Sequence, residues 1–380
     1  MSYGQSGNDN VVNFQYLSGY TLQGFAGYLI GDNPMKAITP SVIPNPNLSW
    51  EEITITGAGL DFSFLNRKIY GEADVFYRKR TGIPGTRQST LPSTFGAALP
   101  QENINSLNNR GFVLMLGTPF DIHDFMFDIS GNLAWSRDKW VHYEEPEYTD
   151  PDEIRLKKVS GNWTDRLFGY KSDKLFGSQA EIDALPFIQD NNNNTSLRPG
   201  DVRYMNMNGD DRLDWRDQVE LGARWPHWTM GFNINARYKN FDLIALFQGA
   251  FNYYTDVWLL KSIRVYSEEV YDLRWTEEKN NTDALVPRMG GSSLNGEASD
   301  YRYKKAGYLR LKNAQFGYNI PKALLNKVSI DQARIFLAGT NLLTFDRLKK
   351  YSIDPEVPFG NAGYYYPQQR TISVGINVSF

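Results

Sequence analysis

The stretch TISVGINVSF, residues 371–380, alternates strictly between polar and apolar side chains. Its even-numbered positions are Ile, Val, Ile, Val and Phe, and its odd-numbered positions are Thr, Ser, Gly, Asn and Ser. Because successive side chains of a strand point to opposite faces, this stretch is apolar on one face only. It therefore predicts a β-strand of about ten residues that presents one face to an apolar medium.

The same alternation recurs in earlier segments. Residues 228–238 and 241–251 flank the short turn Lys239-Asn240, so we expect them to form a tight hairpin. Residues 69–77 and 125–135 alternate in the same way, with Asp, Ser, Asn or charged side chains on the second face. The chain is therefore predicted to be all-β with antiparallel strands.

Two folds satisfy this pattern. A soluble β-sandwich turns its polar face to water, whereas a membrane β-barrel turns its apolar face to lipid and its polar face to a wet lumen. Sandwich strands usually have ~5–6 residues, whereas a strand needs about 9–11 residues to cross a bilayer at a tilt of ~45°. The predicted strands have the greater length, which favours an antiparallel transmembrane β-barrel. The alternative that stays open is a secreted or surface β-sandwich that binds carbohydrate and has a structural calcium site.

Connections between the predicted strands are of two lengths, as in outer-membrane barrels with short periplasmic turns and long external loops. The region 139–226 is predicted to be a long extracellular loop. Rings gather at strand ends, where an interfacial girdle is expected: Trp225, Trp228, Tyr238, Phe251, Tyr253, Tyr254, Trp258 and 364–366. The short connections are 65–67, 120–124, 239–240 and 320–329, and the long ones are 79–110, 139–226, 252–308 and 347–369.

Composition excludes several classes of function. The 380 residues contain no cysteine, so disulfides, thiol nucleophiles and Cys-ligated metals are excluded. The three histidines, His123, His142 and His227, are far apart and lack the spacing of a zinc site. A net charge of −3 without a basic stripe argues against nucleic acid as a partner. No nucleophile elbow, P-loop or dinucleotide motif is present, so we expect no catalytic residues and no enzyme activity.

One segment carries a motif for a hard cation. Residues 206–217 place oxygen ligands at positions 1, 3, 5, 7, 9 and 12 of a loop, the spacing of calcium-binding loops. Asp211 stands where such loops have glycine, so we expect a strained turn there. The loop predicts a structural calcium site, and a metal-free loop of Asx turns is the alternative. The candidate ligands are Asn206, Asn208, Asp210, Arg212 through its main-chain carbonyl, Asp214 and Asp217.

Ordered motifs along the chain resemble those of the SusC/RagA family of TonB-dependent outer-membrane transporters. Each motif alone is short, but their order together is specific. The most specific series is at the end of the chain, where Tyr366-Pro367 and the last strand follow three further motifs. The motifs are residues 2–8, 45–51, 77–81, 199–201, Gly222 and Pro226, then Tyr308-Leu309-Arg310-Leu311-Lys312-Asn313, Gly339-Thr340-Asn341-Leu342 and Asp354-Pro355-Glu356.

The resemblance implies that the chain is the C-terminal part of a barrel of 22 strands in the outer membrane, without the plug domain. The alternation pattern itself predicts about a dozen strands in this chain. It implies import of glycans or peptides, a SusD-like surface lipoprotein as partner, and contact with TonB only through the missing N-terminal part. We expect no active transport without the plug. Phe380 resembles the terminal signal that the barrel-assembly machinery reads. The substrate-binding residues are not identified by the sequence.

Overall fold

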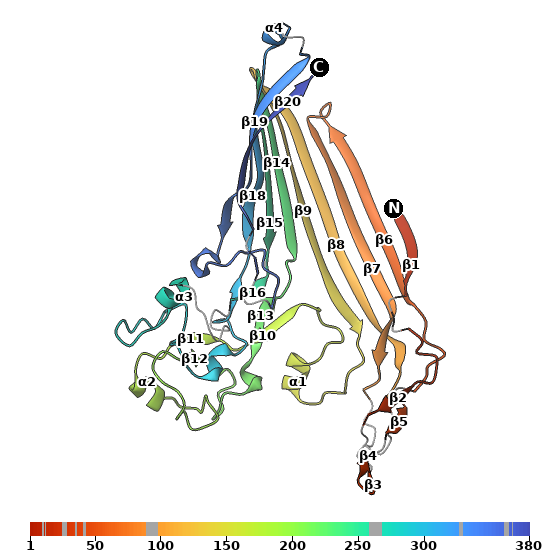
Figure 1. Ribbon diagram of the computed structural model, residues 1–380, viewed down its shortest axis with the longest axis vertical. Helices are drawn as coiled ribbons and strands as arrows, with labels where there is room; N and C mark the ends of the chain where they lie inside the picture. Colours follow the sequence, from red (N-terminus) through yellow and green to blue (C-terminus); the bar gives the residue numbers. More distant parts are fainter. Residues whose placement is uncertain are drawn as a thin grey trace. The chain divides into compact units, whose positions relative to one another are not determined.

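Figure 1 shows the computed structural model of the chain. The structure describes residues 1–380 except 10, 12, 25–28, 35, 41–42, 89–97, 258–267, 327–329, 361–364 and 367. Three residues named above, Trp258, Tyr364 and Pro367, therefore lie outside the described residues.

Ten strands form one antiparallel sheet, and their order in the sheet follows their order in the chain. The all-β, barrel-type fold expected from the alternation is confirmed, with ten sheet strands among the described residues rather than about a dozen. The order is β1 (Ser2–Asn8), β6 (Glu51–Phe64), β7 (Ile69–Thr86), β8 (Gln101–Ile122), β9 (Phe125–His142), β14 (Trp228–Tyr238), β15 (Phe241–Phe251), β18 (Tyr308–Asn319), β19 (Gln332–Asp346) and β20 (Thr371–Ser379).

Tight turns join the strands where the sequence predicts them. β14 and β15 pair in register from Trp228 opposite Phe251 to Tyr238 opposite Phe241. Lys239 closes this hairpin with a left-handed backbone, at a φ of 52°. Such a φ matches the twist of a two-residue hairpin loop. The predicted hairpin 228–251 is confirmed.

The apolar face of the sheet is exposed. On β20, Ile372, Val374 and Ile376 are 68, 76 and 65 % exposed, and the facing Leu337 of β19 is 50 % exposed. A β-sandwich would bury these side chains against a second sheet, so the sandwich alternative does not describe this fold. A contiguous exposed apolar face of this kind fits a lipid-facing barrel wall. Among the described residues, no helix has the length and apolar character needed to cross a membrane.

The chain divides into two compact units, which we describe separately. Unit 1 contains 1–59, 74–112 and 136–164, and unit 2 contains 60–73, 113–135 and 165–380. Outside the sheet, the described residues of unit 1 form two small hairpins and one helix. They are β2 (Tyr20–Gln23) with β5 (Ala37–Pro40), β3 (Leu29–Ile30) with β4 (Asn33–Pro34), and α1 (Pro151–Leu156).

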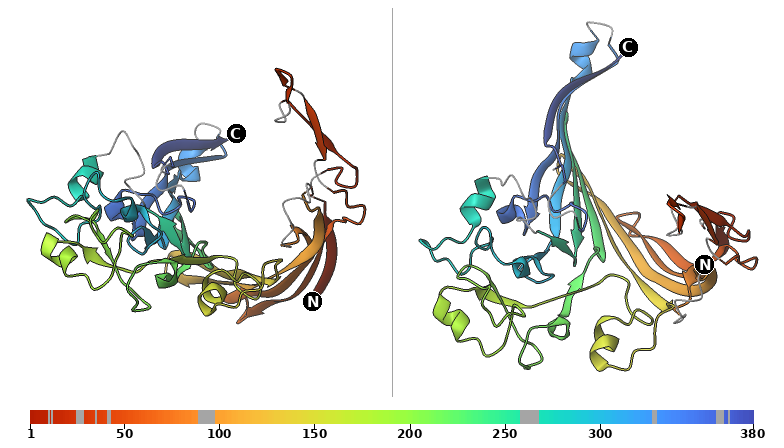
Figure 2. Two further views of the ribbon diagram at one scale, coloured as in Figure 1. Left: turned by 90° about the horizontal axis from the view of Figure 1, so that it is seen from below. Right: turned by 60° about the horizontal axis from the view of Figure 1, so that its bottom comes forward.

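Unit 2 includes a folded body made from the long connections, which we call the loop body: residues 165–227, 252–257, 268–307 and 347–357. Figures 1 and 2 show its small strands gathered at one end of β14, β15 and β18. Its strand pairs are β10 (Arg166–Gly169) with β13 (Val219–Ala223), β11 (Ser172–Leu175) with β12 (Val202–Tyr204), and β16 (Tyr254–Asp256) with β17 (Tyr303–Lys305). Its helices are α2 (Gln179–Asp183), η2 (Trp215–Asp217), α3 (Glu268–Leu273), η3 (Ser293–Gly296) and η4 (Lys349–Tyr351), and α4 (Lys322–Leu325) lies between β18 and β19.

The loop body has its own hydrophobic core. Phe176, Leu197 and Leu348 are fully buried in it. Burying such a side chain is worth roughly 1.5–3 kcal/mol, so these connections fold as compact structure rather than as open loops.

The structure corrects three expectations about the elements. The stretch 79–110 is mostly strand, because β7 continues to Thr86 and β8 begins at Gln101. The predicted loop region 139–226 begins inside β9, which ends at His142. Tyr253 is 8 % exposed in the core of the loop body and donates a hydrogen bond to the carbonyl of Pro355 over 2.8 Å, so it does not belong to an interfacial girdle.

Candidate functional site: the loop body and its buried ion pairs

A buried histidine ties the start of the loop body to strand β14. The Nε2 of His227 contacts Oδ2 of Asp165, and both side chains are almost fully buried. The Nδ2 of Asn252 donates to Nδ1 of His227 over 3.0 Å, which assigns the remaining ring proton to Nε2. His227 therefore connects the segment at Asp165 to the segment at Asn252.

The Pro199-Gly200-Asp201 motif forms a second buried clamp. Asp201 is fully buried, and its carboxylate accepts from Nε of Arg288 over 2.9 Å and from Nδ2 of Asn295 over 2.8 Å. Its second oxygen also accepts from the main-chain N–H of Arg198 over 2.9 Å. A buried carboxylate needs partners of this kind to offset its loss of hydration. One carboxylate thus holds together segments about 90 residues apart.

Gly200 makes this clamp possible. Its φ is 87°, and an added Cβ would lie 2.3 Å from Cε3 of Trp275. A side chain at this position would meet both a left-handed backbone and an occupied space. The glycine therefore lets the main chain pass close to the buried indole.

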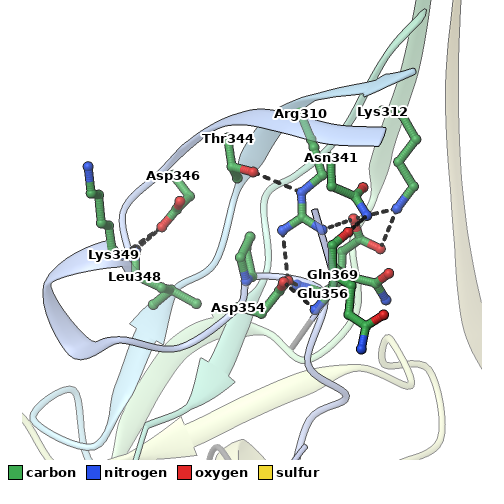
Figure 3. A network of polar contacts seen from close by, with 12 residues as sticks. Arg310, Lys312, Asn341, Thr344, Asp346, Leu348, Lys349, Asp354, Glu356 and Gln369 are labelled. Atoms are coloured by element: carbon green, nitrogen blue, oxygen red, sulfur yellow. Dashed lines mark hydrogen bonds and ion pairs between the residues drawn. The ribbon is translucent and has the colours of Figure 1, made fainter. Parts of the chain in front are cut away.

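A third clamp joins two motifs of the C-terminal series (Figure 3). Arg310 is almost fully buried and donates to Glu356, Asp354 and Thr344 over 2.8, 2.8 and 2.9 Å. Lys312 donates to the carboxylate of Glu356 over 3.0 and 3.1 Å. The motif on β18 is thereby fastened to the Asp354-Pro355-Glu356 turn that follows β19.

Another ion pair lies between the small strands of the loop body. Nε of Arg302 donates to Oδ1 of Asp256 over 2.8 Å, and NH1 donates to the carbonyl of Gly296 over 2.8 Å. Hydrogen bonding to the buried Asp256 raises the pKa of Arg302 above its usual value. The pair keeps β16 and η3 together.

Burial shifts the pKa of other groups in the loop body. Burial raises the pKa of Tyr351 to about 12, and it lowers the pKa of Lys304 to about 8. The Nζ of Lys304 donates to the carbonyl of Asp300 over 2.7 Å and lies 5.2 Å from the ring centroid of Tyr301. A carbonyl and a ring compensate the ammonium less well than water does.

The predicted cation loop, 206–217, forms a closed ring of Asx turns. The side-chain oxygen of Asn206 accepts a hydrogen bond from the main-chain N–H of Gly209. In the same way, the side-chain oxygens of Asn208 and Asp210 accept from the main-chain N–H groups of Asp210 and Arg212, respectively. The hydrogen bond from Arg212 lowers the pKa of Asp210. Asp211 lacks the expected left-handed backbone, because Gly209, with a φ of 76°, makes the turn instead.

The ends of this loop are tied to each other. Asp217 is fully buried, and its oxygens accept from the main-chain N–H groups of Met207 and Asp214, each over 2.8 Å. Asp214 accepts from Arg216. Among the described residues, no three His, Cys, Asp or Glu side chains are grouped as a metal site. A calcium ion would therefore depend also on amide and main-chain oxygens, and this donor set has the hard oxygens that calcium prefers.

An open hollow of about 810 Å³ lies between α2 and the cation loop. It combines apolar surface from Leu185 and Phe187 with polar groups from Asn194, Arg198 and Asp211. A ring beside amide and guanidinium donors can contact the face and hydroxyls of a sugar, or the backbone of a peptide. Sequence reasoning missed this hollow, because its lining residues form no motif.

Several clamp residues were also missed. Arg288, Asn295, Asp256 and Arg302 lie in segments that carry no periodic pattern, and nothing in the sequence reveals which residues they contact. Asp201, Arg310, Asp354 and Glu356 were noticed only as parts of motifs. The carboxylates of the clamps accept their hydrogen bonds from arginine and asparagine side chains of other segments, so the clamps connect distant parts of the chain.

Comparisons with known proteins agree with this architecture. No protein-family model matches the chain. The chain is 28 % identical to TonB-dependent receptor P26 of Formosa agariphila and 26 % identical to TonB-dependent receptor SusC of Bacteroides thetaiotaomicron, in both cases over its whole length. It spans 39 % and 37 % of these relatives, respectively.

The solved structures point to the same fold. A chain of the RagAB peptide importer in its 'open-open' state superimposes with a TM-score of 0.71 and 20 % identity, covering all of this chain and 39 % of that one. The chain is thus similar over its whole length to TonB-dependent receptors, and its fold matches that of the RagAB chain. The resemblance to the SusC/RagA family is confirmed.

Proposed function

We propose that this chain forms barrel wall and external loops of a SusC-like TonB-dependent importer in the outer membrane. The observation that carries the proposal is the exposed apolar face of a ten-stranded antiparallel sheet. A contiguous apolar face of this kind is typical of the lipid-facing wall of an outer-membrane barrel. The similarity to TonB-dependent receptors over the whole chain supports it further.

Membrane fractionation tests this proposal. The protein should stay with the outer membrane after a carbonate wash, require detergent for extraction, and migrate differently in gels before and after heating. A protein that is released by carbonate in folded form would contradict it.

Import of an oligosaccharide or a peptide is the proposed activity. One relative carries the name SusC, and the structural match is described as a peptide importer. The hollow beside Phe187 offers contacts for either ligand. In a full-length receptor that contains this chain, Phe187→Ala should weaken uptake of the labelled cargo severalfold, whereas Ile154→Ala, an exposed apolar change in α1, should not. Phe187 also packs against the core of the loop body, so heat-modifiable migration is measured to show that each variant is folded. We expect no energised uptake by residues 1–380 alone, and saturable, TonB-dependent import by them would contradict this.

A SusD-like surface lipoprotein is the proposed partner. A folded loop body with its own core provides a rigid external platform for such a partner. Affinity purification of the receptor from its native membrane should retain one lipoprotein in stoichiometric amount. Recovery of the receptor alone under mild detergent conditions would argue against the partnership.

For the cation loop we propose a structural calcium ion held by oxygens of Asn206, Asn208, Asp210, Asp214 and Asp217 and the carbonyl of Arg212. Terbium, a calcium substitute, should luminesce when Trp215 in the same loop is excited. Asp210→Asn should weaken terbium binding about tenfold, whereas Asp173→Asn, an exposed acid outside this loop, should not. A loop without sensitised luminescence would support the metal-free Asx-turn alternative.

A further inference from the structure

Three cationic side chains surround one indole ring in unit 1. The charged groups of Arg110, Arg137 and Lys139 lie 4.8, 4.5 and 5.8 Å from the centroid of Trp163. A cation within about 6 Å of a ring face is attracted to it. The side chains come from β8, from β9 and from the segment after α1, so the fold brings this cluster together from distant parts of the sequence.

The cluster lies on the apolar side of the sheet. Lys139 and Trp163 form an antiparallel bridge, so their side chains share one face. Trp140 donates its main-chain N–H to the carbonyl of Asn162 over 3.0 Å, which holds the bridge in place. Along β9, the large apolar residues from Phe127 to Trp135 have odd numbers and share one face of the strand. Arg137 and Lys139 also have odd numbers and lie on this face, whereas Asp138 lies on the other.

The position along β9 matches the headgroup level of a bilayer. Trp135 pairs with Trp228, with ring centroids 6.5 Å apart, as expected for an interfacial aromatic pair. Arg137 and Lys139 follow Trp135 by two and four residues toward the external end. At about 3.3 Å per residue along a strand tilted by ~45°, they lie roughly 5 and 9 Å beyond the aromatic level along the membrane normal. That is the polar region of a membrane leaflet.

The positive charge of this cluster indicates what kind of ligand it would bind. Arg110 is exposed, and within the part of the chain that the structure describes, the side chains of Arg110 and Lys139 form no hydrogen bond or ion pair. Like charges this close repel each other, and a bound anion offsets the repulsion. Guanidinium and ammonium groups suit phosphate oxygens, which present several acceptors.

We propose that Arg110, Lys139 and Arg137 bind the phosphate of an outer-leaflet glycolipid on the outer wall of the barrel. This inference rests on the proposed outer-membrane location. Each basic side chain near a membrane surface strengthens attraction to an anionic lipid, so losing two of them is expected to reduce retention about thirtyfold.

Native mass spectrometry tests the proposal on the protein with its natural flanking sequence, in mild detergent. The probes are monophosphorylated lipid A, the same lipid without phosphate, and inorganic phosphate. The combined variant Arg110→Gln with Lys139→Gln should retain about thirtyfold less phosphorylated lipid than the native protein. The matched control, Lys158→Gln with Lys322→Gln, removes two exposed charges elsewhere and should retain it normally.

Three results would overturn the proposal. They are equal retention of the two lipids by the native protein, unchanged retention by the combined variant, and displacement of the lipid by equimolar inorganic phosphate, which would indicate a free-anion site. Heat-modified migration is measured on every variant. If the native protein does not show heat-modified migration, the outer-membrane assignment is contradicted. If the combined variant migrates like the native protein and retains as much phosphorylated lipid, only the lipid site is rejected.

Discussion

Single charged residues hold the long connections of this protein in place. Asp165, Asp201 and Asp256 are each less than 3 % exposed, and each is paired with a histidine or an arginine from a distant segment. Buried pairs of this kind add little net stability, but removing one partner is costly because a buried charge remains. They therefore specify one loop arrangement over others.

The Arg310 clamp gives the first prediction at this scale. Arg310→Met leaves the Asp354 and Glu356 carboxylates close together without their main donor, so the segment 347–357 should lose about 3 kcal/mol of local stability. Protease cleavage within this segment should accelerate strongly. Lys312→Met, which removes the more exposed partner of Glu356, serves as the control and should have less than half this effect. Equal cleavage rates in the two variants would refute the central role of Arg310.

Lys304 gives a prediction of pH dependence. Its pKa falls from 10.5 to about 8 on folding, because burial outweighs the attraction of Asp300 and Lys350 adds repulsion. The unfolded segment binds more protons than the folded one between these values, so stability should rise from pH 8 to pH 10.5. The change should be about 1–3 kcal/mol. Hydrogen exchange of residues 303–305 should show this rise, and Lys304→Met should abolish it and protect the segment at pH 7.

At the scale of elements, alternation predicted most of the sheet and little of the loop body. β14, β15 and β20 were predicted almost to the residue, because lipid on one side and polar groups on the other impose a period of two. The outer parts of β7 and β8 were missed, since they carry polar side chains on both faces. The small strands such as β11 and β12 have only three or four residues, too few for a periodic signal.

The candidate-site residues were also predicted only where the pattern is local in sequence. The cation loop was visible because its ligands are local in sequence. The clamps were not, because Asp201 finds Arg288 and Asn295 across about 90 residues, and only tertiary folding selects these partners. Tyr253 was wrongly predicted to belong to the interfacial girdle, because an aromatic residue at a strand end can lie either at the membrane interface or in the core of a folded loop.

The tight passage at Gly200 gives a prediction for the β11–β12 region. Gly200→Ala adds a Cβ 2.3 Å from Trp275 on a left-handed backbone, so it should cost about 2–4 kcal/mol. Gly290→Ala is the matched control, because Gly290 has a φ of 69° but open space around its Cβ position. It should cost only about 1 kcal/mol. Hydrogen exchange of residues 199–204 measures the difference in stability between the two variants. Similar protection in both would show that Trp275 can move aside at little energetic cost.

At the scale of the whole molecule, the proposed membrane location rests on the exposed apolar face of the sheet. The terminal Phe380 is 87 % exposed at the end of the same alternating face. Phe380→Asp should reduce the yield of heat-modifiable protein in the outer membrane severalfold, because a charge on the lipid face opposes insertion. Ser379→Asp, which places the same charge on the polar face, should insert normally. Normal insertion of both variants would contradict a role for Phe380 in assembly.

The most direct test of the account is spin labelling along β20. The chain contains no cysteine, so single cysteines can be introduced at each position from Ile372 to Val378 without a background signal. In reconstituted bilayers, labels at 372, 374, 376 and 378 should be accessible to dissolved oxygen, and labels at 373, 375 and 377 to a water-soluble nickel chelate. Labels on the even positions that are shielded from oxygen, or accessible to the chelate, would contradict contact between this face and lipid.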